Sequence, residues 1–274
     1  MTTQDVAVIV PIYRNYLTSE EQLSLLSLQS HLAGFPTFYV CPAGLEFSLP
    51  YTRVEFPSKY FESIDGYNRL MLTKEFYSCF LSFKYILIYQ LDCLIFSSNL
   101  KAFYTLGYDY IGSPWVNSSN GIPTGLAGVG NGGLSLRNTN AFLQVLESGK
   151  KFMRPLEYWE KIGSQKHWWA LPHAVIGILS KFLSYRNNVR WFINQFLNNH
   201  QGRWYPNEDL FWSRWAVRFS PSFRIAPENV ALRFSFEKFP RFCFEMNDEK
   251  LPFGCHGWNR YDPEFWRSYL TGDN

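Results

Sequence analysis

The sequence predicts an α/β protein with a mostly parallel central sheet flanked by helices. Continuous apolar runs at residues 6–10 and 85–89 are typical of strands that are buried on both faces of a parallel sheet. A helical spacing of apolar side chains at 18–33 separates the first run from another short strand pattern at 37–40, and a second helical spacing covers 66–83. Strands that alternate with helices in this way favour βαβ units.

Local signals justify the ends of these elements. The first helix is predicted to begin at Thr18 or Ser19, because a hydroxyl followed closely by Glu21 is typical of a helix N-terminus. The second strand is predicted to stop at Pro42, which has no backbone N–H to donate. A further short strand is predicted at 108–112.

Residues 117–133 are rich in Gly, Ser and Asn and are predicted to form a loop. A strand is predicted at 134–137, directly after a Gly-Asn-Gly-Gly sequence at 130–133. Glycines at such a place let the backbone approach a ligand closely, or they form a tight turn into the strand. We expect Asn131, Gly132 and Gly133 to contact a ligand.

Length and composition indicate one large domain with an insertion. With 274 residues, 46% hydrophobic and 18% charged, the chain can bury a substantial core and is not globally disordered. We expect residues 1–160 and 204–274 to form a single domain and 161–203 to be a helical insertion. The aromatic content of 19% fits a large core or a ligand site lined with rings.

Charge and cysteine usage exclude some classes of protein. A net charge of +3 is too small to indicate nucleic-acid binding. The five cysteines are scattered, without the close spacing of a zinc or redox motif, so we expect reduced thiols in a cytoplasmic protein. The polar start of the sequence does not resemble a signal peptide.

The segment 161–206 differs from the rest of the chain. It carries six Lys and Arg, no Asp or Glu, and many aromatic residues. Its uncharged stretch is shorter than the roughly 20 residues that span a bilayer. We expect the insertion either to lie on an anionic membrane surface, at the inner face of the membrane, or to pack as a helical hairpin.

An acidic residue follows the second long apolar run. Asp92 comes three positions after the end of the predicted strand, with Gln90 two positions before it. The carboxyl end of a parallel strand is where ligands bind in open α/β sheets, and oxygen ligands suit Mg²⁺ or Mn²⁺. The alternative interpretation is a helix cap or a turn.

Two further segments carry chemistry. Glu208 and Asp209 precede an apolar helical run, so they either stabilise a helix N-terminus or provide a general base, for which Asp209 is preferred. His256 lies between Cys255 and Gly257, and we expect it to be exposed in a loop, where it would contact a metal or a phosphate. The alternative for His256 is a core histidine.

These segments resemble GT-A-type glycosyltransferases. Residues 8–15 are similar to the first strand and loop of that Rossmann-like fold, which cups the nucleotide. Residues 89–92 resemble its metal-binding Asp-x-Asp motif, with Gln90 in place of the first acid. Residues 207–209 resemble the acidic pair of inverting enzymes, and His256 is similar to a C-terminal histidine that completes the metal site.

Several blocks resemble more closely a poorly characterised, mainly bacterial family placed with those transferases, a domain of unknown function. The blocks are 67–77, 108–115, 130–137 and 251–256. The resemblance covers roughly 6–145 and 204–260, and the basic insertion lies outside it.

The resemblance implies a metal-dependent, inverting transfer of a sugar from a nucleotide-sugar donor to an acceptor hydroxyl. It implies surface polysaccharide or glycan biosynthesis with a glycan or lipid-linked glycan acceptor, and no nucleic-acid partner. Asp209 would be the base and Glu208 would orient the acceptor or the loop, while Asp92 and His256 would hold Mn²⁺ or Mg²⁺. The donor would contact Tyr13, Asn15, Asn68, Lys74, Gln90, Asn131, Gly132 and Gly133.

Three other functions compete with this one. A nucleotidyltransferase needs a glycine-rich loop after the first strand, and residues 11–15 contain no glycine. A metal-dependent hydrolase needs clustered histidines, whereas the five present are scattered. A non-catalytic carbohydrate-binding or scaffold protein is the main alternative, and Gln90 in place of an acid favours it.

Overall fold

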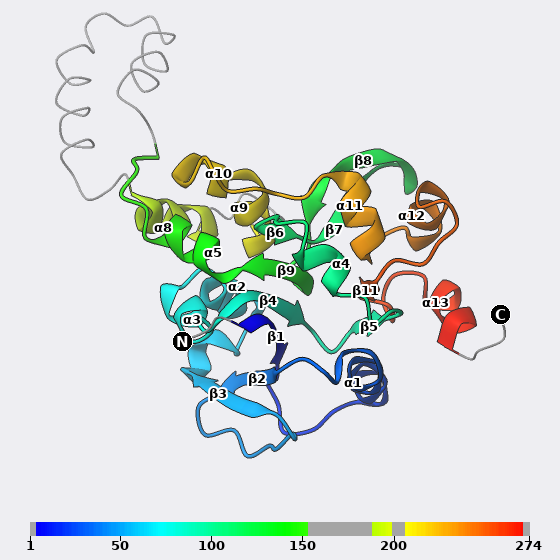
Figure 1. Cartoon of the computed structure of the whole chain (residues 1–274), viewed down its shortest axis with the longest axis horizontal. Coiled ribbons are helices and arrows are strands. Elements are labelled where there is room, and N and C mark those ends of the chain that lie inside the picture. Colours follow the sequence, from blue (N-terminus) through cyan, green and yellow to red (C-terminus); the bar gives the residue numbers. More distant parts are fainter. Residues whose placement is uncertain (1–3, 153–187, 199–205, 271–274) are drawn as a thin grey trace, which may run out of the picture.

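The protein has an α/β architecture with a mainly parallel central sheet, as the sequence predicts. The computed structural model describes residues 4–152, 188–198 and 206–270 (Figure 1). The central sheet has six strands in the order β3-β2-β1-β4-β9-β6. Its strands are β1 (Gln4–Pro11), β2 (Thr37–Pro42), β3 (Thr52–Phe56), β4 (Phe83–Tyr89), β6 (Tyr110–Ile111) and β9 (Leu134–Asn138).

One strand of this sheet, β9, runs opposite to the others. Strands β3, β2, β1 and β4 are mutually parallel, whereas β9 runs antiparallel to both β4 and β6. The start of β9 therefore lies at the carboxyl end of β4, with Leu134 opposite Tyr89. The residues that precede β9 are thereby brought to the ligand-binding edge of the sheet.

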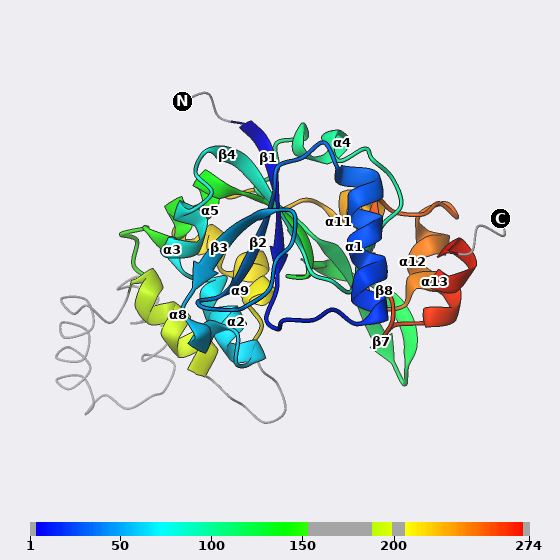
Figure 2. The same cartoon turned by 90° about the horizontal axis from the view of Figure 1, so that it is seen from below.

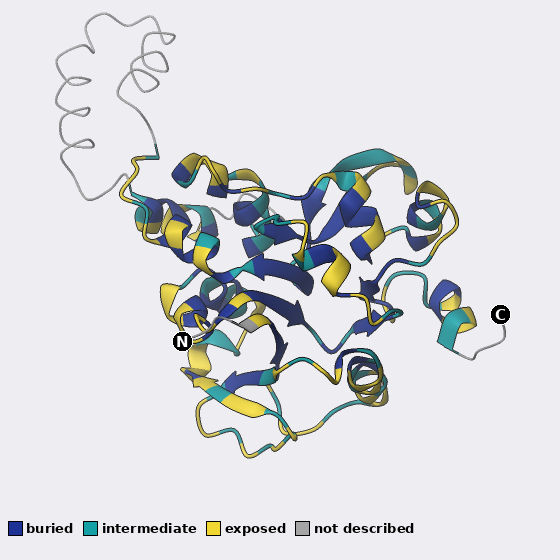
Figure 3. Ribbon diagram, viewed as in Figure 1, coloured by how far each residue is buried: buried dark blue, intermediate teal, exposed yellow. Residues whose placement is uncertain are grey.

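Helices cover both faces of the sheet (Figure 2). Successive residues of β1 point to opposite faces, so Ala7 and Ile9 belong to one hydrophobic cluster and Val8 and Val10 to another. The second cluster includes side chains of α1 (Ser19–Leu32), α4 (Lys101–Tyr104) and α11 (Glu228–Phe234). The first includes side chains of α2 (Ile64–Leu70), α3 (Lys74–Ser78), α5 (Thr139–Leu146), α8 (Val189–Asn198), α9 (Glu208–Arg214) and α10 (Ala216–Phe219). The central strands β1, β4 and β9 are accordingly mostly dark in Figure 3.

Two smaller sheets flank the central one. A three-stranded sheet joins β5 (Cys93–Ile95) to β10 (Ser235–Phe236) and β11 (Gly254–His256), in the order β10-β11-β5. A hairpin is formed by β7 (Ser113–Ser119) and β8 (Ile122–Gly130). The remaining described elements are a short 3₁₀ helix, η1 (Ser58–Tyr60), and the helices α12 (Pro240–Met246) and α13 (Pro263–Leu270).

The predicted strands at 6–10, 37–40, 85–89 and 134–137 and the helix at 18–33 are confirmed. The start of that helix is fixed by Thr18, whose hydroxyl accepts a hydrogen bond from the Glu21 backbone while the Glu21 carboxylate accepts one from the Thr18 backbone. This reciprocal pair is the capping box that the sequence indicates.

Two predicted elements are wrong. The expected loop at 117–133 is largely the β7–β8 hairpin, which turns at Asn120 and Gly121 with φ of 51° and 80°. An Asn-Gly pair is a strong hairpin signal, but the polar, half-exposed strands around it conceal the pattern. The expected helix at 66–83 is two helices, because the Thr73 hydroxyl accepts from the Phe76 backbone and starts α3.

The predicted insertion 161–203 lies mostly outside the described residues. Its described part includes α8, in which Phe192, Ile193 and Leu197 are buried in the cluster that also holds Phe211 of α9. For α8, therefore, the apolar face covers the protein core. Among the helices in the described ranges, none is long and apolar enough to cross a membrane.

Gly112 joins the central sheet to the β7–β8 hairpin and has no room for a side chain. A Cβ atom there would lie 1.7 Å from the carbonyl oxygen of Gly130. We expect Gly112→Ala to lower the free energy of unfolding by about 1–3 kcal/mol, as overpacking does, measured by urea denaturation. Gly34→Ala is the control, since an added Cβ meets nothing within 4 Å there. Equal stability of the two variants would show that Gly112 does have room for a side chain.

Candidate active site

A cleft of about 1020 Å³ lies at the carboxyl edge of the central sheet. The end of β1 and the residues after it, Pro11 to Arg14, line it together with the residues that follow β4, Gln90 to Asp92. The reversed strand β9 adds Gly132 and Gly133, and the Gln90 backbone N–H donates to the Gly133 carbonyl at 2.9 Å. The cleft therefore occupies the ligand-binding position of an open α/β sheet.

The three-stranded sheet brings His256 to this cleft. His256 is paired with Cys93 in the antiparallel β11–β5 ladder, and the Gly257 N–H donates to the Asp92 carbonyl at 2.8 Å. The expectation of an exposed loop histidine is wrong, because His256 ends a strand and is only 7% exposed. Its imidazole nevertheless lines the cleft.

Polar atoms from three segments converge on the His256 ring. Nε2 lies 3.2 Å from Oε1 of Gln90 and 3.2 Å from Oδ1 of Asp92. Arg260 donates from Nη2 to Oδ2 of Asp92, and the same Nη2 is 3.4 Å from Nε2 of His256. Burial opposes the ionisation of Asp92, but His256 and Arg260 lower its pKa overall.

The other ring nitrogen of His256 faces a second carboxylate. Nδ1 lies 3.1 Å from Oε1 of Glu237. Burial alone would lower the pKa of His256, but the carboxylates of Asp92 and Glu237 outweigh it and raise the pKa to about 9. With no other cation present, the ring is therefore a buried imidazolium at neutral pH.

The residues around His256 fit a divalent cation that a ligand completes. Oδ1 of Asp92 is buried without a hydrogen-bond partner, and Nε2 of His256 and Oε1 of Gln90 are the neighbouring donor atoms. Within the described ranges, no group of three His, Cys, Asp or Glu side chains could hold a metal. Mg²⁺ in particular is commonly bound by one or two carboxylates together with substrate phosphates.

A buried ion pair fixes the wall opposite His256. Arg137 of β9 donates to both carboxylate oxygens of Glu208, at 2.7 and 3.2 Å, and the two side chains are 0% and 2% exposed. Arg137 also donates to the Tyr77 hydroxyl at 2.9 Å. The Glu208 backbone N–H in turn donates to Oδ1 of Asn68 at 3.1 Å. The first turn of α9 is thus held by β9, α2 and α3.

Asp209 follows in the same turn and faces the cleft. Its Oδ2 accepts from the Asn131 backbone N–H at 2.9 Å, and its Oδ1 accepts from that of Leu210 at 2.9 Å. Burial raises the pKa of Asp209 above its usual range, and the negative charge of Glu237 adds to this. A fixed carboxylate with a raised pKa is a stronger base than an exposed aspartate.

The two glycines before β9 leave space for these side chains. A Cβ at Gly132 would lie 2.2 Å from Oε1 of Glu208, and one at Gly133 would lie 2.2 Å from Nε2 of His256. Asn131 adopts a φ of 81°, and its Oδ1 accepts from the Gly133 N–H at 2.7 Å. The Gly-rich segment therefore packs against the acid and the imidazole.

Most residues of the predicted site line this one cleft, and three do not. Asn15 is exposed and outside it. Lys74 pairs with Glu147, 3.3 Å away, and the structure does not bring it to the cleft. Asn131 is buried and acts through its hydrogen bonds to Asp209 and Gly133. The predicted residues that line the cleft are Tyr13, Asn68, Gln90, Asp92, Gly132, Gly133, Glu208, Asp209 and His256.

Three residues that contact the candidate site are not predicted from the sequence. Arg137 was read as part of a strand, although an Arg that alternates with apolar residues in a buried strand signals a buried ion pair. Glu237 follows the two-residue strand β10, which is too short to predict. Arg260 lies in a turn, and nothing in its local sequence points to Asp92.

The charge of the cleft is mostly negative. Of the described residues that line it, Arg14, Arg260 and the His256 imidazolium carry positive charge, and Arg14 is paired with Glu21 at 2.6 Å. A phosphate-containing ligand would be repelled from such a lining unless it carried a cation with it. The acidic residues of the lining are Glu20, Glu21, Glu62, Asp92, Glu208 and Asp209.

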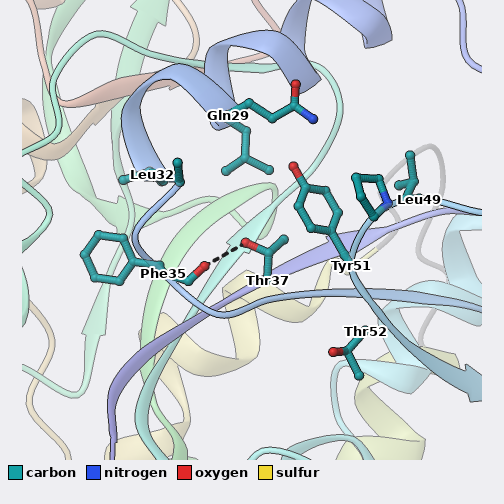
Figure 4. A pocket seen from close by; sticks show the side chains of 10 residues that line it. Gln29, Leu32, Phe35, Thr37, Leu49, Tyr51 and Thr52 are labelled. Atoms are coloured by element: carbon teal, nitrogen blue, oxygen red, sulfur yellow. Dashed lines mark hydrogen bonds between the residues drawn. The ribbon is translucent and has the colours of Figure 1, made fainter.

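A second cavity, of about 660 Å³, lies between the end of α1 and residues 49–52 (Figure 4). It shares no lining residue with the cleft. Of the described residues around it, none carries a full charge at neutral pH, and the Thr37 hydroxyl donates locally to the Phe35 carbonyl at 3.1 Å.

Residues 50–256 match the family described as "Protein of unknown function (DUF5672)". No curated protein matches the sequence.

Similar solved structures include a glycosyltransferase involved in glycosylation of the major capsid of PBCV-1, with 10% identity and a TM-score of 0.40 over 92% of this chain and 93% of that one. The galactosyltransferase LgtC in complex with donor and acceptor sugar analogues has 14% identity and a TM-score of 0.47, over 91% and 86%. At such values neither similarity transfers a function to this chain.

The buried ion pair predicts a large effect of one truncation. Glu208→Ala leaves the Arg137 guanidinium without its counter-ion in the core, so we expect a loss of about 3–5 kcal/mol in the free energy of unfolding. Glu147→Ala, which removes the exposed partner of Lys74, should cost less than about 1 kcal/mol. Urea denaturation of both variants measures this difference, and similar losses would refute it.

Proposed function

We propose that this chain, which belongs to the DUF5672 family, is a glycosyltransferase that uses a nucleotide-sugar donor. The observation that carries the proposal is that Asp92, His256 and Asp209, far apart in the sequence, line a single cleft at the carboxyl edge of the sheet. Sugar transfer from a diphosphate requires groups that bind a cation and a base that accepts the acceptor proton. Here an acid and an imidazole form one wall of the cleft, and a carboxylate base forms the other. The resemblance of these segments to GT-A enzymes supports the same function.

The donor occupies the side of the cleft formed by β1 and β4. The exposed Tyr13 ring stands at the rim with the Arg14 guanidinium 5.0 Å from its centroid, an arrangement suited to a nucleobase and ribose. Asp92, His256 and Gln90 would hold Mn²⁺ or Mg²⁺ together with the diphosphate. A bound cation of this kind neutralises the charge that develops on a leaving diphosphate.

The transfer step uses Asp209. Its carboxylate accepts the proton of the acceptor hydroxyl, whose oxygen forms a bond with the anomeric carbon. The bond from that carbon to the donor phosphate breaks, and the nucleoside diphosphate leaves from the opposite face. A single displacement of this kind inverts the anomeric configuration. The N–H groups of Asn131 and Leu210 fix the carboxylate, and Glu208 holds the helix turn that carries it.

The acceptor is a glycan or a lipid-linked glycan in surface polysaccharide assembly. This part of the proposal rests on the sequence resemblance. Membrane contact through 161–203 and a cytoplasmic location belong to the same proposal, and most of that segment lies outside the described residues.

Replacing the base tests the chemistry directly. We expect Asp209→Asn to lower kcat about 10²- to 10⁴-fold, because the amide cannot accept the proton, while donor binding is kept. As the pH is lowered, kcat/KM of the wild type should fall when Asp209 becomes protonated. Since burial raises the pKa of Asp209, this loss should begin above the roughly 3.9 of an ordinary aspartate. Nucleotide release with a donor panel measures both effects.

Asp65→Asn is the matched control for this variant. Asp65 lies in α2, pairs with Arg69 at 2.8 Å and does not line the cleft, so its removal should leave turnover unchanged. Wild-type turnover in Asp209→Asn would eliminate Asp209 as the base.

The acidic lining predicts how ligands bind. Because no described triad of protein side chains completes a metal site, Mn²⁺ alone should stabilise the protein little, and a nucleoside diphosphate with Mn²⁺ should stabilise it more than the two effects summed. At 100 times Kd the rise in Tm should be about 5 °C. Thermal unfolding with UDP, GDP and dTDP, with and without Mn²⁺, provides the measurement.

The same experiment distinguishes the alternative function. If none of the three nucleotides raises Tm with either Mn²⁺ or Mg²⁺, the chain is not a nucleotide-sugar enzyme. A carbohydrate-binding or scaffold role on this fold would then replace the proposal.

A further inference from the structure

The residue behind His256 is fixed by the register of a short parallel pair of strands. In β10 and β11, Ser235 is opposite Gly254 and Phe236 is opposite Cys255. One position further along the same register, Glu237 comes opposite His256. The backbone pairing therefore places this carboxylate beside the imidazole whatever the cleft contains.

The contact between the two side chains is specific. Oε1 of Glu237 lies 3.1 Å from Nδ1 of His256, and the Glu237 side chain is 19% exposed. A carboxylate can only accept a hydrogen bond, so Nδ1 carries a proton and donates it. Glu237 is absent from the described lining of the cleft, so it touches His256 from behind.

The opposite ring nitrogen is aimed at the cation position. Nε2 faces Oδ1 of Asp92 and Oε1 of Gln90, both at 3.2 Å. Oδ1 of Asp92 accepts no hydrogen bond, and once a cation takes the place of the Nε2 proton, these two atoms offer it two donor atoms. A histidine that binds a metal almost always donates its other N–H to a carboxylate or carbonyl, which fixes the ring and the tautomer.

We infer that Glu237 is a positioning residue for the divalent cation: by accepting the Nδ1 proton of His256, it holds Nε2 toward the cation that accompanies the donor diphosphate. This inference rests on the proposed function, since it assigns a role within the same site. Glu237 does not touch the donor. It acts through the orientation and tautomer of the imidazole.

The test measures cation-dependent nucleotide binding instead of turnover. The nucleoside diphosphate among UDP, GDP and dTDP that binds the wild-type chain is titrated calorimetrically at several Mn²⁺ concentrations. We expect Glu237→Ala to weaken the apparent Mn²⁺ affinity of the complex about 10- to 100-fold. Glu237→Gln, whose amide oxygen still accepts from Nδ1, should recover most of the affinity.

A matched control separates this role from a general effect of removing an acid. Glu245 is an exposed carboxylate on α12, and Glu245→Ala should bind as the wild type does. Wild-type affinity in Glu237→Ala, with nucleotide binding intact, would overturn the positioning role and leave the proposed function standing. Absence of Mn²⁺-dependent nucleotide binding in the wild type would overturn both.

A second measurement needs no variant, in case Glu237→Ala does not fold. Nitrogen-15 NMR of histidine-labelled wild-type protein reports which ring nitrogen carries the proton in the complex with Mg²⁺ and the nucleotide. We expect His256 to be protonated on Nδ1 and bare on Nε2. A proton on Nε2 in that complex would refute the inference.

Discussion

The ion pair between Arg137 and Glu208 connects the central sheet to the helix turn that carries the proposed base. Both charges are sealed in the core, and such a pair is stable only when its hydrogen-bonding groups are satisfied. Here Tyr77 and Ser135 take two of the remaining donor positions of the guanidinium. Because Asp209 follows Glu208 directly, the position of its carboxylate depends on this pair, and so does the wall of the cleft that faces His256.

The central strands could be predicted because uninterrupted runs of apolar residues must be buried. Apolar runs such as 85–89 have only one stable environment, which is a sheet covered on both faces. Elements with mixed burial were harder to predict. Strand β3 (Thr52–Phe56) has mostly exposed or half-buried side chains and was not predicted, and the β7–β8 hairpin was taken for a loop. In these segments the pairing with neighbouring strands, rather than local propensity, decides the structure.

The cleft was predictable in part for a related reason. Carboxyl ends of parallel strands meet at one edge, so acids placed after them could be brought together from the sequence alone. Glu237 and Arg260 could not, because their contacts with His256 and Asp92 arise from the β10–β11–β5 sheet and the turn that follows it. Lys74 is the opposite case, because it is predicted to lie in the site and does not. Its position in a family-like block predicted a donor contact, whereas the start of α3 directs it to Glu147.

The pairing of β5 with β11 has a consequence for how the protein reaches its native state. Cys93 and His256 are neighbours in space but are separated by more than half of the chain. Contacts of such long range form slowly, since closing a large loop costs entropy before any stabilisation is gained. The part of the protein built around β1 and β4 can condense first, while the imidazole docks late. The cleft thus takes its final form at the end of folding, and chains trapped before that stage would look compact yet lack the assembled site.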